Sequence, residues 1–172
     1  MLVGAPGAGK STIGRQVARR LGVGFRDTDG DIEAVARKRI SEIFVDDGEA
    51  AFRRLEGEAV ATALETHDGV LSLGGGAVLD AETRAQLAGH RVLLLDVDLS
   101  SATARVGLNR DRPVLALNPR AVLKGLLAER MPLYHEVADV VVQTSGRPVP
   151  AVVDEVLAYL RAQPSTEAGG AP

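Results

Sequence analysis

The stretch Gly4-Ala5-Pro6-Gly7-Ala8-Gly9-Lys10-Ser11 matches the pattern G-x-x-x-x-G-K-[ST] at every defined position. It follows the short apolar pair Leu2-Val3, and a helical pattern begins directly after it, with Ile13, Val17 and Leu21 on one face. Glycines let backbone N–H groups converge on a phosphate, and a helix N-terminus favours negative charge. The pattern therefore predicts a phosphate-binding loop between a strand and a helix.

The same loop predicts the class of ligand. Lys10 is placed to reach the β- and γ-phosphates of a nucleoside triphosphate, and Ser11 offers a hydroxyl to Mg²⁺. A glycine-rich turn that only joins a strand to a helix is the alternative, but such a turn has no use for Lys10. The residues expected to contact the nucleotide from this loop are Gly7, Ala8, Gly9, Lys10, Ser11 and Thr12.

Short apolar segments alternate with helical patterns along the rest of the chain. The expected strands lie at 2–3, 70–73, 92–95 and 138–143. The expected helices lie at 11–21, 31–39, 41–46, 49–66, 80–87, 102–106, 120–134 and 149–163, and Pro132 is expected to end or kink the seventh. Apolar strands that alternate with helices favour a parallel sheet covered on both faces. We predict an α/β fold, a three-layer α/β/α sandwich with a central parallel sheet.

The domain organisation follows from the same reading. Residues 1–163 are expected to form one kinase-like domain, and the polar, arginine-containing loop at 109–119 is expected to be a mobile lid. The tail at 164–172 contains only Pro, Ser, Thr, Glu, Ala and Gly and is expected to be disordered.

Composition limits the function classes. A net charge of −3 leaves no broad basic surface for nucleic acid, and 3% aromatic residues disfavour a base-stacking platform. The absence of cysteine excludes thiolate nucleophiles and cysteine-based zinc sites, and the three histidines are interpreted as surface or packing residues. No apolar stretch approaches the roughly 18 residues of a membrane span, and no signal peptide precedes the glycine run. We expect a soluble, cytoplasmic protein.

A pair of carboxylates follows the first helix. If the segment around Asp27 and Asp29 is a strand, these side chains point the same way, beside the phosphate loop. One could serve hydrated Mg²⁺, and the other could hold and deprotonate an acceptor hydroxyl. Two solvated turn residues are the alternative.

Two further segments are candidates for the acceptor side. Three consecutive glycines at 74–76 follow a strand and allow close backbone approach to a ligand, with a flexible turn as the alternative. Arg53 and Arg54 point about 100° apart on a helix, so at most one of them faces a site. A solvated charged face, paired with Glu49 or Glu56, is the alternative for this segment.

Two more arginines lie late in the chain. Arg112 belongs to the expected lid, and phosphoryl transfer needs cations that spread over the transferring group while water is kept out. Arg130 precedes Met131-Pro132-Leu133-Tyr134 and could instead serve only as a cation near a helix C-terminus.

Taken together, these segments resemble the shikimate kinases. The resemblance covers about residues 2–160 and rests on GAPGAGKSTIGR at 4–15, DTD at 27–29, FRRLE at 52–56, LGGGAV at 73–78, RPVL at 112–115 and ERMPLY at 129–134. It implies transfer of the γ-phosphate of ATP to the 3-hydroxyl of shikimate, in the pathway to chorismate and the aromatic amino acids. The family has a longer first strand than the three residues that precede Gly4 here.

The resemblance also implies roles for individual residues. Lys10 and Ser11 would serve ATP and Mg²⁺, and Asp27 would meet the metal through water. Asp29 would hold the shikimate hydroxyls, including the one that attacks. Arg112 would stabilise the transferring phosphoryl group.

The remaining implied contacts involve both ligands. Arg53 and Arg130 would clamp the shikimate carboxylate, and the backbone at 74–76 would close on the ring. Arg105 and Arg147 match positions that flank the adenine in some relatives. A bidentate arginine suits a carboxylate and an aspartate suits a diol, so the physical chemistry agrees with these roles.

The expected partners are ATP and shikimate, with Mg²⁺ as the metal, and the protein is expected to be a monomer that binds neither nucleic acid nor membranes. One alternative is another P-loop small-molecule kinase, such as a gluconate kinase or a nucleoside monophosphate kinase. A second is a nucleotide-dependent regulatory switch without a small substrate. The set Asp29, Arg53 and Arg130 has no evident task in such a switch.

Overall fold

The computed structural model describes residues 1–107 and 119–162. Its centre is a five-stranded sheet with the order β2-β3-β1-β4-β5, in which every pairing is parallel. The strands are β1 (Leu2–Val3), β2 (Gly24–Asp27), β3 (Gly69–Ser72), β4 (Leu93–Asp96) and β5 (Val140–Gln143). Because β1 lies between β3 and β4, the segment that follows it leaves from the middle of the carboxyl edge of the sheet.

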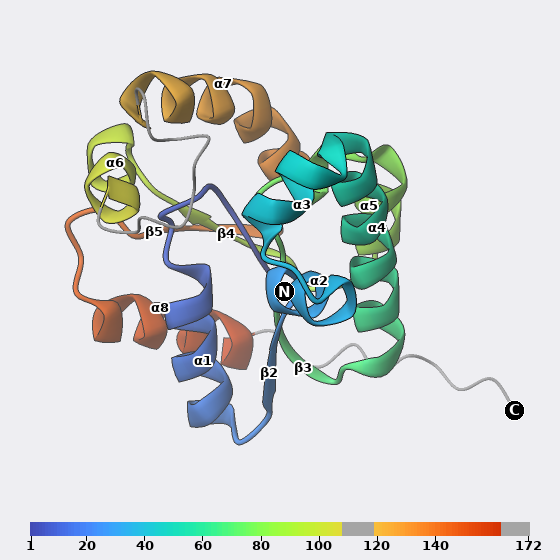
Figure 1. Ribbon diagram of the computed structural model, residues 1–172. Coiled ribbons are helices and arrows are strands. Elements are labelled where there is room, and N and C mark those ends of the chain that lie inside the picture. Colours follow the sequence, from blue (N-terminus) through green and yellow to red (C-terminus); the bar gives the residue numbers. More distant parts are fainter. Residues whose placement is uncertain (108–118, 163–172) are drawn as a thin grey trace, which may run out of the picture.

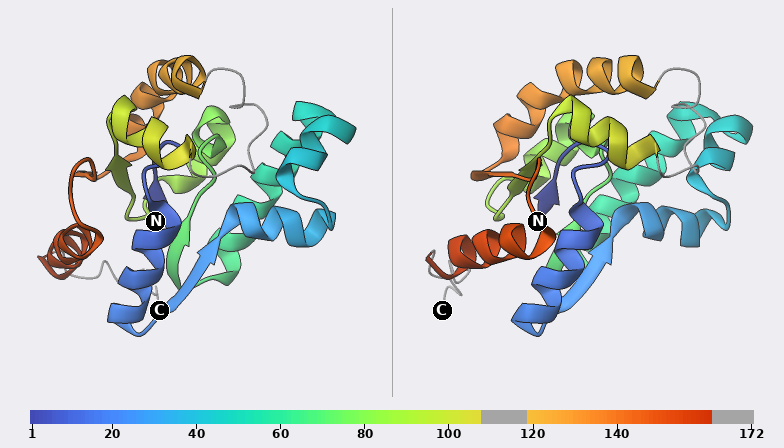
Figure 2. Two further views of the ribbon diagram at one scale, coloured as in Figure 1. Left: turned by 60° about the vertical axis from the view of Figure 1, so that its left-hand side comes forward. Right: turned by 90° about the vertical axis from the view of Figure 1, so that its left-hand side faces the viewer.

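Helices cover the sheet on both sides. They are α1 (Lys10–Leu21), α2 (Thr28–Ala36), α3 (Ile40–Asp46), α4 (Gly48–Thr66), the 3₁₀ helix η1 (Ala77–Leu79), α5 (Ala81–Leu87), α6 (Leu99–Gly107), α7 (Pro119–Val137) and α8 (Val149–Ala162). Figures 1 and 2 show α1 and α8 on one side of the sheet and α6 and α7 on the other. The predicted α/β/α sandwich with a parallel sheet is confirmed.

Two groups of apolar side chains stabilise this arrangement. The main core is built largely from Val, Leu and Ala, and it includes the continuous buried run Val92–Leu95 of the β4 region. A second, smaller cluster contains Ile32, Ile43 and Phe52, from α2, α3 and α4 respectively. These three helices project from one end of the sheet (Figure 2), so their small core holds them together as an arm beside the carboxyl edge.

Several predicted boundaries differ from the observed ones. The helices expected at 31–39 and 102–106 begin earlier, at Thr28 and Leu99. Pro132 does not end its helix, because α7 continues to Val137. A proline costs one backbone hydrogen bond, but Leu123 and Tyr134 on either side of it are buried, and this packing holds the helix together. The predicted lid, apart from Pro119 in α7, and the predicted tail lie outside the described residues.

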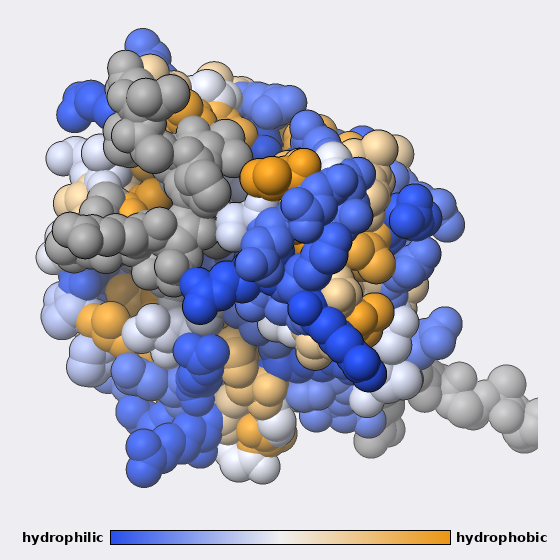
Figure 3. Space-filling model, viewed as in Figure 1, coloured by the Kyte–Doolittle hydropathy of each residue, from blue (hydrophilic) through white to orange (hydrophobic). Residues whose placement is uncertain are grey.

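The surface in Figure 3 is mainly hydrophilic, and its apolar residues are scattered singly or in small groups. The large apolar side chains with the highest exposure are Val35 and Val45, on α2 and α3. Within the described ranges, no helix is both long enough and apolar enough to cross a lipid bilayer.

Candidate active site

The glycine loop between β1 and α1 has the backbone geometry that its sequence requires. Gly7 and Gly9 have φ values of 84° and 92°, in the left-handed region that side chains oppose. Gly9 is the N-cap of α1 and provides no side chain to cap it. The Ala8 N–H donates to the Ala5 carbonyl oxygen at 3.1 Å. The remaining N–H groups of the loop and of the first turn of α1 favour an anion at the carboxyl edge of the sheet.

The two polar side chains that end this loop face different ways. The Lys10 Nζ folds back over the loop and donates to the carbonyl oxygens of Gly4, at 2.7 Å, and Ala5, at 3.3 Å. The Ser11 hydroxyl donates to the Asp27 Oδ2 atom at 2.6 Å. One cation thus lies directly above the anion-binding loop, and a hydroxyl–carboxylate pair lies beside it.

The pair Ser11 and Asp27 fits a magnesium site. Mg²⁺ prefers oxygen donors and usually keeps several waters, so it needs only one or two protein ligands. Asp27 is the last residue of β2, which places its carboxylate at the same edge of the sheet as the glycine loop.

Asp27 and Asp29 do not lie together on a strand, and that expectation was wrong. The strand ends at Asp27, which is the N-cap of α2, and its Oδ1 atom accepts from the Asp29 N–H at 3.2 Å. Asp29 lies in the first helical turn. The change of direction separates the two carboxylates, so that Asp27 faces Ser11 while Asp29 faces Gly74.

Asp29 and Glu56 both lie against the glycine segment that follows β3. A Cβ atom added to Gly74 would lie 2.6 Å from the Asp29 Oδ1 and 2.7 Å from the Glu56 Oε1. The Gly74 N–H donates to the hydroxyl of Thr28 at 3.0 Å, which fixes the segment to the start of α2. The absence of side chains at Gly74 thus lets two carboxylates approach the backbone closely.

Arg53 belongs to this group, whereas Arg54 does not. The Arg53 guanidinium donates to the Glu56 Oε2 at 2.6 Å and to the Glu49 Oε1 at 3.0 Å. Its Nη1 would lie only 2.0 Å from a Cβ atom on Gly76, so this glycine makes room for the guanidinium. The Arg54 side chain is 68% exposed. Arg53 is paired with Glu49 and Glu56, as expected for a solvated charged face. Its guanidinium also reaches the glycine segment, which a purely solvated face would not explain.

Glu56 is the buried member of this charged group. Its exposed fraction is 3%, and burial raises the pKa of its carboxyl group, against the opposing effect of the Arg53 guanidinium. The nearby negative charge of Asp29 raises the same pKa further, while the positive charge of Arg130 lowers it. Arg53, Asp29 and Arg130 are therefore all close enough to Glu56 to affect its carboxyl group.

Helix α7 approaches the glycine segment from a different direction. The Arg130 Nη1 and the Tyr134 hydroxyl both donate to the Gly75 carbonyl oxygen, at 3.0 and 2.6 Å. The Arg130 Nε atom is buried and has no hydrogen-bond partner among the described residues; the Glu129 carboxylate is 3.9 Å away. A buried guanidinium with unused donor capacity is suited to an anionic ligand.

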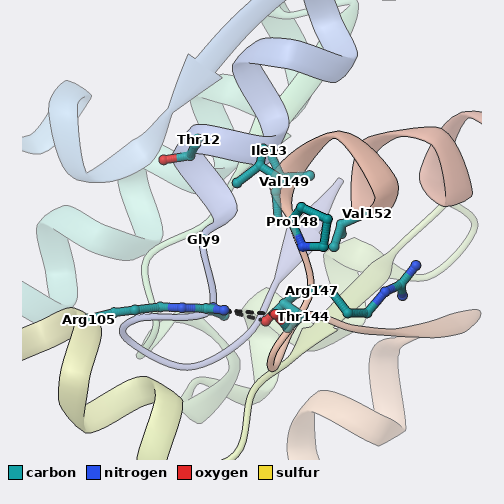
Figure 4. A pocket seen from close by; sticks show the side chains of 10 residues that line it. Gly9, Thr12, Ile13, Arg105, Thr144, Arg147, Pro148, Val149 and Val152 are labelled. Atoms are coloured by element: carbon teal, nitrogen blue, oxygen red, sulfur yellow. Dashed lines mark hydrogen bonds between the residues drawn. The ribbon is translucent and has the colours of Figure 1, made fainter.

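A cavity of about 350 Å³ opens on the other side of the glycine loop (Figure 4). It is lined by Ala8, Gly9, Thr12, Ile13, Arg105, Thr144, Arg147, Pro148, Val149 and Val152. Arg105 crosses it and donates to the Gly7 and Thr144 carbonyl oxygens, at 3.0 and 2.7 Å. The Arg147 guanidinium points away from the cavity, donates to the Gln143 carbonyl at 2.9 Å and forms an ion pair with Glu155.

The structure thus places the predicted residues in two adjoining groups. Loop residues 7–12, with Arg105 and Arg147, surround the cavity or the anion-binding point, while Asp29, Arg53 and Arg130 surround the glycines at 74–76. The two groups adjoin, because a Cβ atom on Gly75 would lie 3.3 Å from the Pro6 ring. Arg112 lies outside the described residues.

Three residues that contact the glycine segment were not predicted as site residues: Thr28, Glu56 and Tyr134. Only Glu56 left a signal in the sequence, because it occupies the buried face of α4 together with Phe52, Val60 and Ala63. A glutamate on an apolar face indicates a buried charge that needs a partner. Thr28 and Tyr134 form hydrogen bonds with glycines that lie 46 and 59 residues away in the sequence, and no local pattern reveals such contacts.

A phosphate loop that ends in Lys10 and Ser11, beside a pocket of acids and arginines at the carboxyl edge of a parallel sheet, defines a P-loop kinase. The comparisons with known proteins narrow this class. A family model described as shikimate kinase matches residues 6–161.

Individual proteins agree with that match. The chain is 59% identical over 160 residues to a shikimate kinase of Frankia casuarinae, covering 93% of this chain and 71% of the relative. It is also 59% identical over 160 residues to a shikimate kinase of Salinispora tropica, covering 93% and 96%. The shikimate kinase of Acinetobacter baumannii, solved in complex with shikimate, superposes with a TM-score of 0.89 at 34% identity and covers 94% of this chain and 91% of that one. The chain belongs to the shikimate kinase family.

Proposed function

We propose that this protein transfers the γ-phosphate of ATP to the 3-hydroxyl of shikimate and releases shikimate 3-phosphate and ADP. The observation that carries the proposal is the contact between the two halves of the site, since the glycines at 74–76 adjoin both the phosphate loop and the Asp29, Arg53 and Arg130 group. Adjacent sites would hold the two reactants next to one another, which removes much of the entropic part of the barrier.

On the nucleotide side, we assign the triphosphate to the loop amides at 7–12 and to Lys10. The cavity beside the loop suits the adenine, because the flat guanidinium of Arg105 lies on one side and apolar side chains such as Ile13 and Val152 lie on another. Arg147 would contact the nucleotide only after its guanidinium turns from Glu155. Arg112 would supply a further cation to the transferring group.

We assign Mg²⁺ to Ser11 and, through water, to Asp27, because their oxygen atoms form the hard donor pair beside the loop. When bound with ATP, the metal neutralises charge on the phosphates. Asp27 also keeps α2 in place through its N-cap bond, so that its carboxylate serves both the metal and the helix that carries Asp29.

On the acceptor side, we assign the carboxylate of shikimate to Arg53 and Arg130. Glu56 and Glu49 hold the Arg53 guanidinium, and the unused Nε of Arg130 is available as a donor. Asp29 would then hold the attacking hydroxyl and take its proton as the new oxygen–phosphorus bond forms and the bond to the ADP oxygen breaks. The positive charge of Lys10 stabilises the phosphoryl group during this exchange.

We further propose that residues 1–163 act as one kinase domain and as a monomer, in the cytoplasm, without nucleic-acid or membrane partners. The net charge of −3 supports the absence of a nucleic-acid partner. The exposed apolar side chains of the described residues are scattered, which supports a monomer. Light scattering coupled to size exclusion would test the monomer, and a mass of twice 18.0 kDa would contradict it.

Replacing Arg53 with alanine is expected to raise the KM for shikimate and leave the KM for ATP unchanged. The variant loses a partly buried, charge-assisted pair between the Arg53 guanidinium and the shikimate carboxylate. Such a pair is worth about 2–3 kcal/mol, or roughly 30- to 150-fold in affinity. Steady-state kinetics with each substrate varied in turn would measure both constants. Arg54→Ala is the matched control, because Arg54 is the next residue in the sequence and its side chain is exposed. A collapse of ATP affinity in R53A would contradict the placement of this helix.

An acceptor panel tests the proposed function directly. Release of ADP from Mg-ATP is measured with shikimate, gluconate, nucleoside monophosphates or no acceptor, and the product is identified by phosphorus NMR. We expect rapid release with shikimate alone and a phosphate ester at its 3-position. Equal or faster release with gluconate or a nucleotide would contradict the proposal, as would hydrolysis that no acceptor accelerates.

A further inference from the structure

The glycine segment after β3 forms a β-turn whose type is known from its backbone. The Ala77 N–H donates to the Gly74 carbonyl oxygen at 3.1 Å, so residues 74–77 make the turn. Gly76, its third residue, has φ −101° and ψ −10°. A type II turn requires a positive φ at that position, and a type II′ turn requires one at the second residue, where Gly75 has none. The turn is therefore of type I.

The sequence alone does not select this type. Glycine at the third position is the residue that a type II turn prefers, and glycine at the second position opposes neither form. The two types differ chiefly in the central peptide, here Gly75–Gly76, which roughly reverses its direction between them. The sequence 74–77 is therefore compatible with both directions of the central peptide, and a contact that holds the Gly75 carbonyl oxygen favours the direction observed.

Helix α7 supplies that contact. The Gly75 carbonyl oxygen accepts from the Tyr134 hydroxyl at 2.6 Å and from the Arg130 Nη1 at 3.0 Å. Every peptide bond described is trans, so the Gly76 N–H points away from this carbonyl and from the two donors of α7. Within the described chain, neither Gly75 nor Gly76 donates its N–H to a backbone carbonyl, and both donors are therefore available to a ligand.

An anionic substrate would affect the two donors of α7, Arg130 and Tyr134, differently. Arg130 is charged and has unused donor capacity, so an incoming carboxylate competes for its guanidinium. The Tyr134 phenol is neutral and is only 1% exposed, and its ring is packed in the main core. Its bond to Gly75 can therefore persist while Arg130 is recruited to the ligand.

We propose that Tyr134 is a positioning residue, whose hydroxyl holds the Gly75–Gly76 peptide in the type I orientation and so keeps the Gly76 N–H available to the acceptor. The proposal rests on the proposed function in one respect, because it takes the acceptor to bind against this turn. A flipped peptide would present the Gly75 carbonyl oxygen to an anionic ligand in place of an N–H donor, which would repel the ligand.

The test is Tyr134→Phe, which keeps the buried ring and removes one hydroxyl. The chain has one other tyrosine, Tyr159 in α8, and Tyr159→Phe is the matched control. We expect Y134F to raise the KM for shikimate roughly five- to tenfold, the worth of one hydrogen bond, with the KM for ATP unchanged. A lower melting temperature with unchanged kinetics would reveal a structural role only and overturn the proposal.

A spectroscopic measurement tests the peptide itself, without any acceptor. Protein labelled with glycine that carries ¹³C at the carbonyl and ¹⁵N gives carbonyl–nitrogen correlations only for Gly-Gly pairs, which occur at 74–75, 75–76 and 169–170. In Y134F we expect the 75–76 signal to shift or broaden, while 169–170 and the whole Y159F spectrum stay as in the wild type. An unchanged 75–76 signal would overturn the proposal.

The two experiments also separate this proposal from the proposed function. If the wild-type protein fails to phosphorylate shikimate, the proposed function fails, and the 75–76 signal still reports whether Tyr134 holds the peptide. If the wild type is active and Y134F changes neither the KM nor the signal, only the role of Tyr134 fails.

Discussion

Lys10→Ala is expected to lower kcat by roughly 10³-fold or more, because removal of one cation from the transferring phosphoryl group costs that much in comparable sites. The Lys10 Nζ lies over the glycine loop, within 2.7 Å of the Gly4 carbonyl oxygen, and no other lysine is near this position in the sequence. Without it, the charge that develops between the β- and γ-phosphates is balanced less well. Turnover at saturating Mg-ATP and shikimate, followed by ADP release, measures the loss.

The control for this prediction is Lys124→Ala, which removes a lysine from an exposed position of α7. We expect K124A to retain wild-type kcat, so that a loss in K10A is not a general effect of charge. The melting temperature of K10A should fall little, because the Lys10 Nζ donates to two carbonyl oxygens of its own loop, those of Gly4 and Ala5. A kcat of K10A within a few-fold of the wild type would refute the assignment of the phosphate loop.

The second large effect is expected from Asp29→Asn. The amide has almost the same shape as the carboxylate and can still hold a hydroxyl, but it cannot take the proton from that hydroxyl. Loss of general base catalysis typically costs about 10²- to 10⁴-fold. We expect kcat to fall within this range, while the KM for shikimate changes much less. The N-cap bond of α2 uses the backbone N–H of Asp29, so the helix should not be disturbed.

Asp31→Asn provides a matched control for this variant. Asp31 lies one half-turn further along α2, and its carboxylate forms an ion pair with Arg26 at 2.6 Å instead of facing Gly74. We expect D31N to keep its kcat and to lose only a little stability, since a pair that is partly exposed contributes little. Wild-type turnover in D29N would remove Asp29 from the chemistry.

The nucleotide half of the site could be predicted from the sequence because it is local. The residues at 4–12 form one continuous loop and helix start, and their spacing alone determines that backbone N–H groups, Lys10 and Ser11 meet. The parallel sheet was also predictable, since continuous apolar strands alternate with helices. Strand order and register needed the structure.

The acceptor half could be assigned only partly, because it is assembled across the chain. Asp29, Arg53 and Arg130 were identified through the resemblance, and without it a solvated face remained a fair interpretation of Arg53. The strand geometry expected for Asp29 was wrong, because Asp27 caps a helix that begins one residue later. Tyr134 could not be predicted, since its hydroxyl meets Gly75 only after the sheet and α7 have packed.

The most direct test of the whole account is a crystal structure of the protein with shikimate and an ATP analogue that resists transfer. We predict the triphosphate on the loop that ends at Lys10, the acceptor hydroxyl beside Asp29, and the acceptor carboxylate between Arg53 and Arg130. A shikimate molecule bound with its carboxylate away from both arginines, or with its hydroxyl out of line with the terminal phosphate, would contradict the account.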